Sequence, residues 1–66
     1  MESFDGYSKA WARFSVWVVG KGLMCACADV IEADGAFHTY VRTYPDKNVL
    51  VYELESNTCI MQRLAI

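Results

Sequence analysis

Four turn signals divide most of this chain into short segments, and they limit the fold more than any other feature of the sequence. They are GKG at 20–22, ADGA at 33–36, YPDKN at 44–48 and ESNT at 55–58. The segments around them are rich in Val, Ile, Tyr, Phe and Thr, which suit a pleated surface. Because connections this short join antiparallel neighbours, the pattern predicts a mainly β fold. We expect a five-stranded antiparallel meander, either an open sheet or a small partly rolled barrel, with the strands FSVWVV, LMCACADVIEA, FHTYVRTY, VLVYELE and CIMQRLAI.

The first 13 residues differ from the rest. Phe4, Tyr7, Ser8 and Trp11 fall at i, i+3, i+4 and i+7, which is the spacing of one helical stripe. A short N-terminal segment of one or two helical turns is therefore expected to pack on the sheet, and pairing as an extra strand is the alternative. Since no repeat, linker or low-complexity stretch is visible, residues 1–66 are expected to form a single small β domain.

The apolar content is high for so small a chain. The sequence has 66 residues, of which 55% are hydrophobic, while a domain of this size buries only about 60% of the surface that its unfolded chain exposes. Some apolar surface is therefore expected to be covered by a partner protein or by a second copy in a homodimer. Such a dimer would pack two sheet faces about 10 Å apart or join two edge strands across a two-fold axis.

A strand register follows if Asp34 and Gly35 form a two-residue type I′ turn. Because side chains alternate between the sides of a sheet, the strands would present two different faces. One face is mixed, and it holds Cys25, Cys27, Asp29, Ile31, His38, Tyr40, Arg42, Tyr44, Val49, Val51, Glu53 and Glu55. The other face is apolar and is the expected core, and it holds Ala26, Ala28, Val30, Phe37, Val41, Leu50, Tyr52 and Leu54, joined by Cys59, Met61 and Trp17.

The mixed face supplies the candidate binding site. Tyr and Arg are enriched at the energetic centres of protein interfaces, and a guanidinium binds carboxylates in bidentate geometry. The simpler interpretation is a set of cross-strand ion pairs worth about 0.2–1 kcal/mol each. The predicted partner-binding residues are Tyr40, Arg42, Tyr44, His38, Glu53 and Asp29.

Metal and catalytic sites are only weakly indicated. Three cysteines and His38 are ligand types that Zn²⁺ accepts, but C-A-C at 25–27 lacks the spacing of a zinc knuckle, and the register separates Cys59 from the other two. Buried cysteines that act as small apolar side chains are the commoner interpretation. His38 is a candidate general base, yet no nucleophile is placed against it. We therefore predict no catalytic residue, no metal and no cofactor, and we do not expect an enzyme.

The charge pattern disfavours nucleic acid and membranes as partners. The net charge is −2 and the six basic residues are scattered, whereas nucleic-acid binders gather theirs on one face. The apolar region 14–31 contains two glycines and Lys21, which favours a hairpin over a membrane span. The first residues lack the basic and apolar regions of a signal peptide, so a cytoplasmic location, in a bacterium or in a host cell, is expected.

These features favour a binding protein. We expect a small non-catalytic protein-interaction module, a stoichiometric inhibitor or adaptor of the kind that phages and mobile elements carry, which binds its partner through one sheet face or an edge strand. The comparison rests on size and composition alone. Two alternatives stay open. One is a domain that stacks single-stranded nucleic acid on exposed aromatic side chains, and the other is a metal or redox sensor built on the cysteines.

Overall fold

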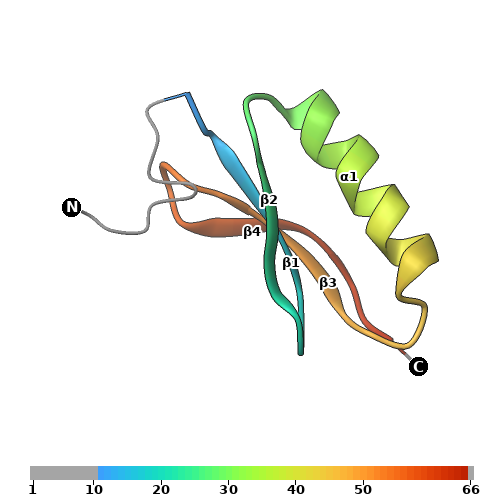
Figure 1. Ribbon diagram of the computed structural model, residues 1–66. Coiled ribbons are helices and arrows are strands. Elements are labelled where there is room, and N and C mark those ends of the chain that lie inside the picture. Colours follow the sequence, from blue (N-terminus) through green and yellow to red (C-terminus); the bar gives the residue numbers. More distant parts are fainter. Residues whose placement is uncertain (1–10, 66) are drawn as a thin grey trace.

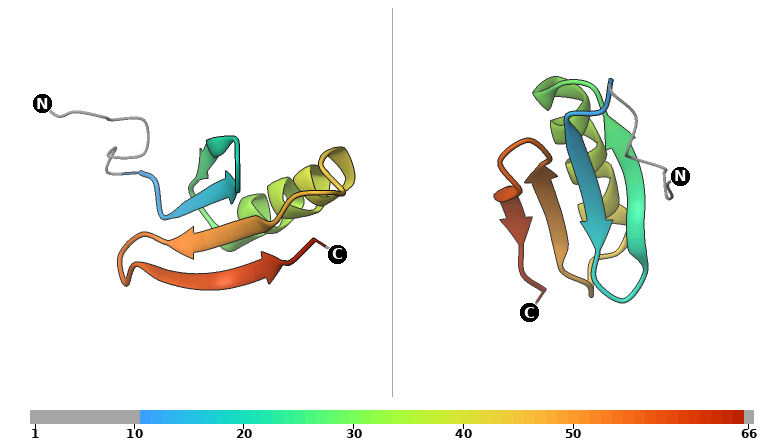
Figure 2. Two further views of the ribbon diagram at one scale, coloured as in Figure 1. Left: turned by 90° about the horizontal axis from the view of Figure 1, so that it is seen from below. Right: turned by 90° about the vertical axis from the view of Figure 1, so that its left-hand side faces the viewer.

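The chain folds into a sheet with a helix across one side of it (Figures 1 and 2). A computed structural model describes residues 11–65. The sheet has four strands in the order β2-β1-β3-β4, and every neighbouring pair is antiparallel. The fold is therefore mainly β, as predicted, with four strands where five were expected. The elements in chain order are β1 (Phe14–Val18), β2 (Gly22–Cys27), α1 (Val30–Thr43), β3 (Val49–Glu53) and β4 (Thr58–Arg63).

Two hairpins, β1–β2 and β3–β4, build the sheet, and they meet where β1 pairs with β3. The predicted turn at 20–22 is confirmed, and Gly20 (φ +94°) and Gly22 (φ +100°) supply the left-handed backbone that it needs. Because β1 lies between β2 and β3, those two strands run parallel to one another. A parallel connection requires a long crossover, and α1 provides it.

The predicted strand FHTYVRTY is wrong, because residues 37–43 belong to α1, a helix of 14 residues, and Tyr44 is its C-cap. The predicted strand LMCACADVIEA is too long, because β2 ends at Cys27 and the last four residues of the predicted strand begin α1.

The helix begins at a reciprocal cap in which the carboxylate of Asp29 accepts a hydrogen bond from the backbone N–H of Glu32 at 2.9 Å. The carboxylate of Glu32 in turn accepts one from the backbone N–H of Ala28, also at 2.9 Å. Asp34 and Gly35, predicted as a hairpin turn, lie inside the helix.

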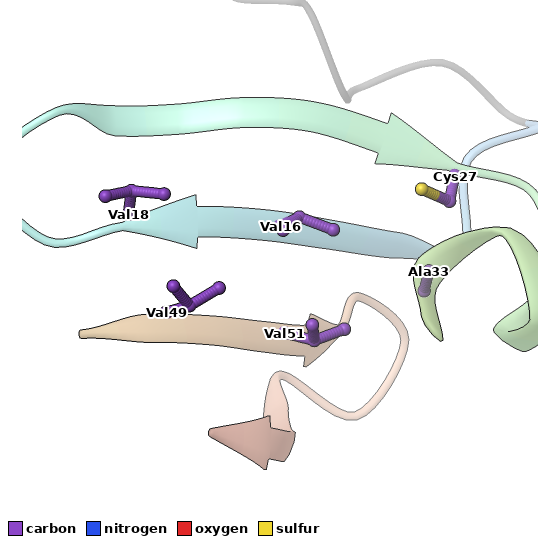
Figure 3. Packing of buried hydrophobic residues seen from close by; sticks show 6 residues of the cluster. All are labelled: Val16, Val18, Cys27, Ala33, Val49 and Val51. Atoms are coloured by element: carbon purple, nitrogen blue, oxygen red, sulfur yellow. The ribbon is translucent and has the colours of Figure 1, made fainter. Parts of the chain in front are cut away.

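The position of α1 decides which side of the sheet becomes the core. Its main contacts are with β1, β2 and β3, and it covers the side of the sheet that carries the valines of the two central strands (Figure 3). The predicted core, on the side of Leu50 and Tyr52, was therefore the wrong side. The buried apolar residues are Val16, Val18, Cys27, Ala33, Val49 and Val51.

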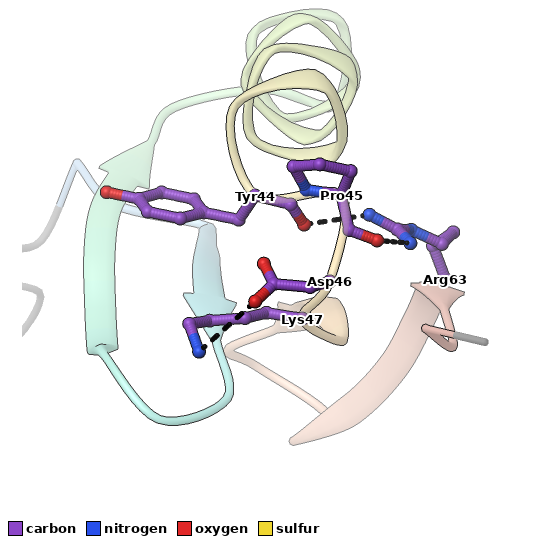
Figure 4. A network of polar contacts seen from close by, with 5 residues as sticks. All are labelled: Tyr44, Pro45, Asp46, Lys47 and Arg63. Carbon is purple, nitrogen blue, oxygen red and sulfur yellow. Dashed lines mark hydrogen bonds and ion pairs between the residues drawn. The ribbon is translucent and has the colours of Figure 1, made fainter.

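Arg63 fastens the end of α1 to β4 (Figure 4). Its Nη1 donates to the carbonyl oxygen of Pro45 at 2.7 Å, and its Nη2 donates to the carbonyl oxygens of Tyr44 at 2.9 Å and Val41 at 3.1 Å. The positive charge thus lies where the last carbonyls of the helix concentrate partial negative charge. The Nε of Arg63 is buried without a hydrogen-bond partner among the described residues.

Two other expectations concern the N-terminal segment and membrane-spanning helices. The helical stripe predicted for the N-terminal segment lies outside the described residues except for its last member, Trp11, which is 52% exposed. Between residues 11 and 65, no helix combines the length and the apolar character that crossing a membrane would take.

Candidate functional site

The side of the sheet away from α1 carries the side chains that alternate with the core. We call this surface the open face, and Figure 2 (right) views the sheet from it, with α1 behind. The strand register arranges the open face in two cross-strand rows. None of the side chains in these rows is charged. The first row is Ala26, Ser15, Tyr52 and Cys59, and the second is Leu23, Trp17, Leu50 and Gln62.

A hollow of about 560 Å³ lies on the open face. Its floor is Ser15, which is 1% exposed, and larger side chains from Trp17, Leu50, Tyr52 and Leu54 surround it. Residues of the β1–β2 turn and of the loop between β3 and β4 also line the hollow. A small residue on a central strand between larger neighbours therefore explains why the sheet is hollowed here.

The polar groups of the hollow are few. The indole Nε1 of Trp17 donates a hydrogen bond to the hydroxyl of Ser15 at 2.9 Å. An apolar ligand that covered Trp17 would therefore leave no indole N–H unsatisfied, and so would avoid the cost of about 1–3 kcal/mol for an unpaired buried donor. The arrangement suits apolar side chains better than charged groups.

The structure separates the predicted partner-binding residues. Asp29 caps α1, and His38 lies exposed on α1 with its Nε2 3.3 Å from the Oδ1 of Asp34. Arg42 is exposed in the last turn of α1. Glu53 ends β3, where its carboxylate accepts a hydrogen bond from the hydroxyl of Ser56 at 2.6 Å. The mixed face predicted from the strand register therefore does not form.

The two tyrosines of that set lie between α1 and the sheet. The rings of Tyr40 and Tyr44 stack with their centroids 6.3 Å apart, and both side chains pack against the core. Burial, together with the neighbouring thiol of Cys25, raises the pKa of Tyr40 above its ordinary value. The role of all six residues in partner binding stays a prediction, but their grouping on one sheet face is wrong.

The cysteines are divided between the two sides of the sheet. The sulfur atoms of Cys25 and Cys27 lie 3.9 Å apart on the side that α1 covers, while Cys59 is exposed and pairs with Tyr52 on the open face. Burial, with a contribution from Cys25, raises the pKa of the Cys27 thiol to about 12, which keeps it protonated and unreactive near neutral pH. In the part of the chain that the structure describes, no three His, Cys, Asp or Glu side chains are grouped to hold a metal ion.

Comparison of the chain with protein-family models, with curated proteins and with solved structures finds no match. The four bulky residues that line the hollow of the open face were predicted as core, because alternation groups them correctly but does not say which group the helix covers. They are Trp17, Leu50, Tyr52 and Leu54. One signal in the sequence favoured the other side, namely the β-branched residues Val16, Val18, Val49 and Val51 at the centres of two strands.

Proposed function

We propose that this chain is a non-catalytic protein-interaction module, a stoichiometric inhibitor or adaptor, and that the open face binds the partner protein. The observation that supports this most directly is the uncharged hollow between Trp17 and Tyr52. Trp and Tyr are enriched among the residues that carry most of the binding energy in protein interfaces. A contiguous apolar surface on a small protein commonly marks such an interface.

The chemistry of the hollow indicates what the partner must present. The volume, about 560 Å³, falls in the range of about 300–1,000 Å³ that binding pockets occupy. A site for a small molecule also needs a few polar groups that converge and orient it, but the side chains that line the hollow are mostly apolar, and the Ser15 hydroxyl already accepts a hydrogen bond from Trp17. We therefore expect a protein segment that inserts bulky apolar side chains.

Single-stranded nucleic acid is the alternative that the aromatic residues raise. Bases stack on exposed aromatic side chains, and Trp17 and Tyr52 offer two rings. Affinity for a phosphate backbone comes mainly from Lys and Arg, and the two cross-strand rows of the open face carry neither. Arg13, opposite Leu54 at the end of these rows, lies 3.9 Å from the carboxylate of Glu55, which offsets its charge. The lack of unpaired positive charge in these rows therefore favours a protein partner.

Selection of peptides from a random library displayed on phage, against the full chain, tests the proposal without knowledge of the natural partner. We expect the selected peptides to carry bulky apolar residues. Leu54→Asp, which places a charge at the hollow, should weaken their binding by about tenfold or more. Ile31→Asp is the matched control, because Ile31 is 81% exposed on α1, on the other side of the sheet.

Two results would contradict the proposal. One is peptides that bind the L54D variant as tightly as they bind the wild type, with circular dichroism showing that the variant is folded. The other is a loss of binding in the I31D variant or in Arg42→Ala, which would move the binding surface to α1 and support the residues predicted from the sequence. Binding that weakens steeply with salt and is competed by single-stranded DNA would favour the alternative.

A further inference from the structure

The hydrogen bonds of β3 determine which backbone groups of β4 face outward. The backbone N–H of Leu54 donates to the carbonyl of Arg13 at 2.8 Å, just beyond the paired residues of β1 and β3. In an antiparallel ladder, hydrogen-bonded positions alternate along the strand. The even-numbered residues of β3 therefore bond to β1, and the odd-numbered residues, Val49 and Val51, bond to β4.

The register then places the outward groups of β4. Val49 pairs with Arg63 and Val51 pairs with Met61, so these two residues of β4 direct their backbone groups inward. Gln62 lies between these two residues and Leu64 follows Arg63. Both direct their backbone N–H and C=O groups away from the sheet. β4 is thus an edge with free hydrogen-bonding groups, as the order β2-β1-β3-β4 requires.

This edge lacks the usual protection. Natural edge strands commonly carry Lys, Pro or an inward-pointing charge that blocks pairing with another chain. The one charged residue of β4, Arg63, is turned onto the carbonyls at the end of α1. The bulge of β4 lies between Cys59 and Met61, which leaves the residues from Met61 onward regular.

Two exposed apolar side chains flank Gln62, each two residues away along the chain. Ile60, at the bulge of β4, is 40% exposed, and Leu64, one residue beyond β4, is 61% exposed. If a second β4 paired antiparallel about a two-fold axis through Gln62, Met61 of each copy would lie opposite Arg63 of the other. Leu64 of each copy would then come near the bulge residue Ile60 of the other. A glutamine amide both donates and accepts hydrogen bonds, so it can pair with its own copy, whereas a charged residue would repel it.

We propose that β4 pairs with β4 of a second copy of this chain, antiparallel and centred on Gln62. The sheets of the two copies then become continuous, with both helices on the same side and the two open faces side by side. The interface is isologous, as the two-fold symmetry of a homodimer demands. Since it uses the edge and not the hollow, this inference goes beyond the proposed function and does not depend on it.

The test exploits the two-fold axis, on which residue 62 meets itself. The molar mass of the full chain is measured by analytical ultracentrifugation over a range of concentrations, in reducing buffer because Cys59 is exposed. We expect the molar mass of the wild type to increase from that of one chain to that of two chains as the protein concentration increases. Gln62→Lys and Gln62→Glu should each raise the dimer dissociation constant by about tenfold or more, and an equimolar mixture of the two should restore association.

Controls separate this interface from others. Thr39→Lys adds the same charge at an exposed position on α1 and should associate as the wild type does. The proposal is overturned by a wild type that stays at one chain at every concentration, or by Q62K and Q62E variants that associate unchanged. It is also overturned if Leu54→Asp abolishes the dimer while Q62K does not, because the open face would then be the interface. Peptide binding is measured on the wild type, so a chain that stays at one copy and still binds the selected peptides overturns the dimer but leaves the open-face proposal standing.

Discussion

Replacing Arg63 by Met should destabilise the fold by about 2 kcal/mol. The guanidinium donates to three carbonyl oxygens, of Pro45, Tyr44 and Val41, at 2.7–3.1 Å. A hydrogen bond from a charged donor contributes about 1.5–3 kcal/mol, and we take about 1 kcal/mol for each of these because the site is only half-buried. Loss of the charge at the end of α1 adds about 0.3–1 kcal/mol. Release of the long side chain, and of its unpaired Nε, offsets about 1–2 kcal/mol of this loss.

Unfolding by urea measures the effect. Each variant is studied at two protein concentrations, since an association would make the midpoint depend on concentration. Arg63→Lys keeps the charge but not the planar fork of donors, and should lose about 1 kcal/mol. Arg42→Met, at an exposed position in the last turn of the same helix, should stay within about 0.5 kcal/mol of the wild type. The reasoning is refuted if R63M also stays within that limit, or if R42M costs as much as R63M.

Four further predictions concern the helix and the thiols. Gly35→Ala should raise the thermal midpoint and stabilise the fold by about 0.5–1 kcal/mol, because the added methyl group meets no atom within 4 Å apart from its chain neighbours and the nearby backbone of its own helix; an unchanged midpoint would contradict this. Asp29→Ala should cost about 1 kcal/mol in urea unfolding by removing the cap, and Asp29→Asn should recover most of it. Ellman's reagent should label Cys59 in the folded chain and Cys27 only after unfolding. Since burial raises the pKa of Cys27 from 9.0 to about 12, the unfolded chain loses this proton first, so stability should fall as pH rises through that interval, and less steeply in Cys27→Ala.

The hairpins could be predicted from the sequence because their signals are local. The glycines at 20 and 22 mark a turn that needs positive φ, the run before it becomes β1, and the first part of the run after it becomes β2. The same holds for the loop at 55–58 and the strands that it joins. Within a hairpin, the partner of each strand is its neighbour in sequence, so turn chemistry and alternation are sufficient.

The helix could not be predicted in the same way, because its residues favour helix only weakly. Gly35, Thr39 and several β-branched side chains lower helix propensity over 30–43, and Asp34-Gly35 resembles a hairpin turn. Packing against the sheet stabilises α1 instead, through Ala33, Phe37 and Tyr40. The cap formed by Asp29 and Glu32 is the signal that was available, since an acidic cap three residues before a glutamate marks a helix start.

The candidate site was predicted only in part, for a related reason. Alternation correctly placed Trp17, Leu50, Tyr52 and Leu54 on one face. Which of two apolar faces is buried depends on where the helix lies, and that is a tertiary property. Once α1 covers the side of Val16, Val18, Val49 and Val51, the open face is left uncovered by the helix, and it is the surface proposed here for binding.

The pairing of β1 with β3 has a consequence for how the chain reaches its fold. Phe14–Val18 pairs with Val49–Glu53, so these partners are far apart in sequence, whereas both hairpins close over a few residues. Pairing of β1 with β3 is therefore expected to be the rate-limiting step of folding. α1 spans the gap as a tether that keeps the two hairpins at high local concentration. A cut in the loop between Tyr44 and Val49 would leave one hairpin in each piece. The affinity of the two pieces for one another would then measure how strongly the two hairpins associate through the pairing of β1 with β3.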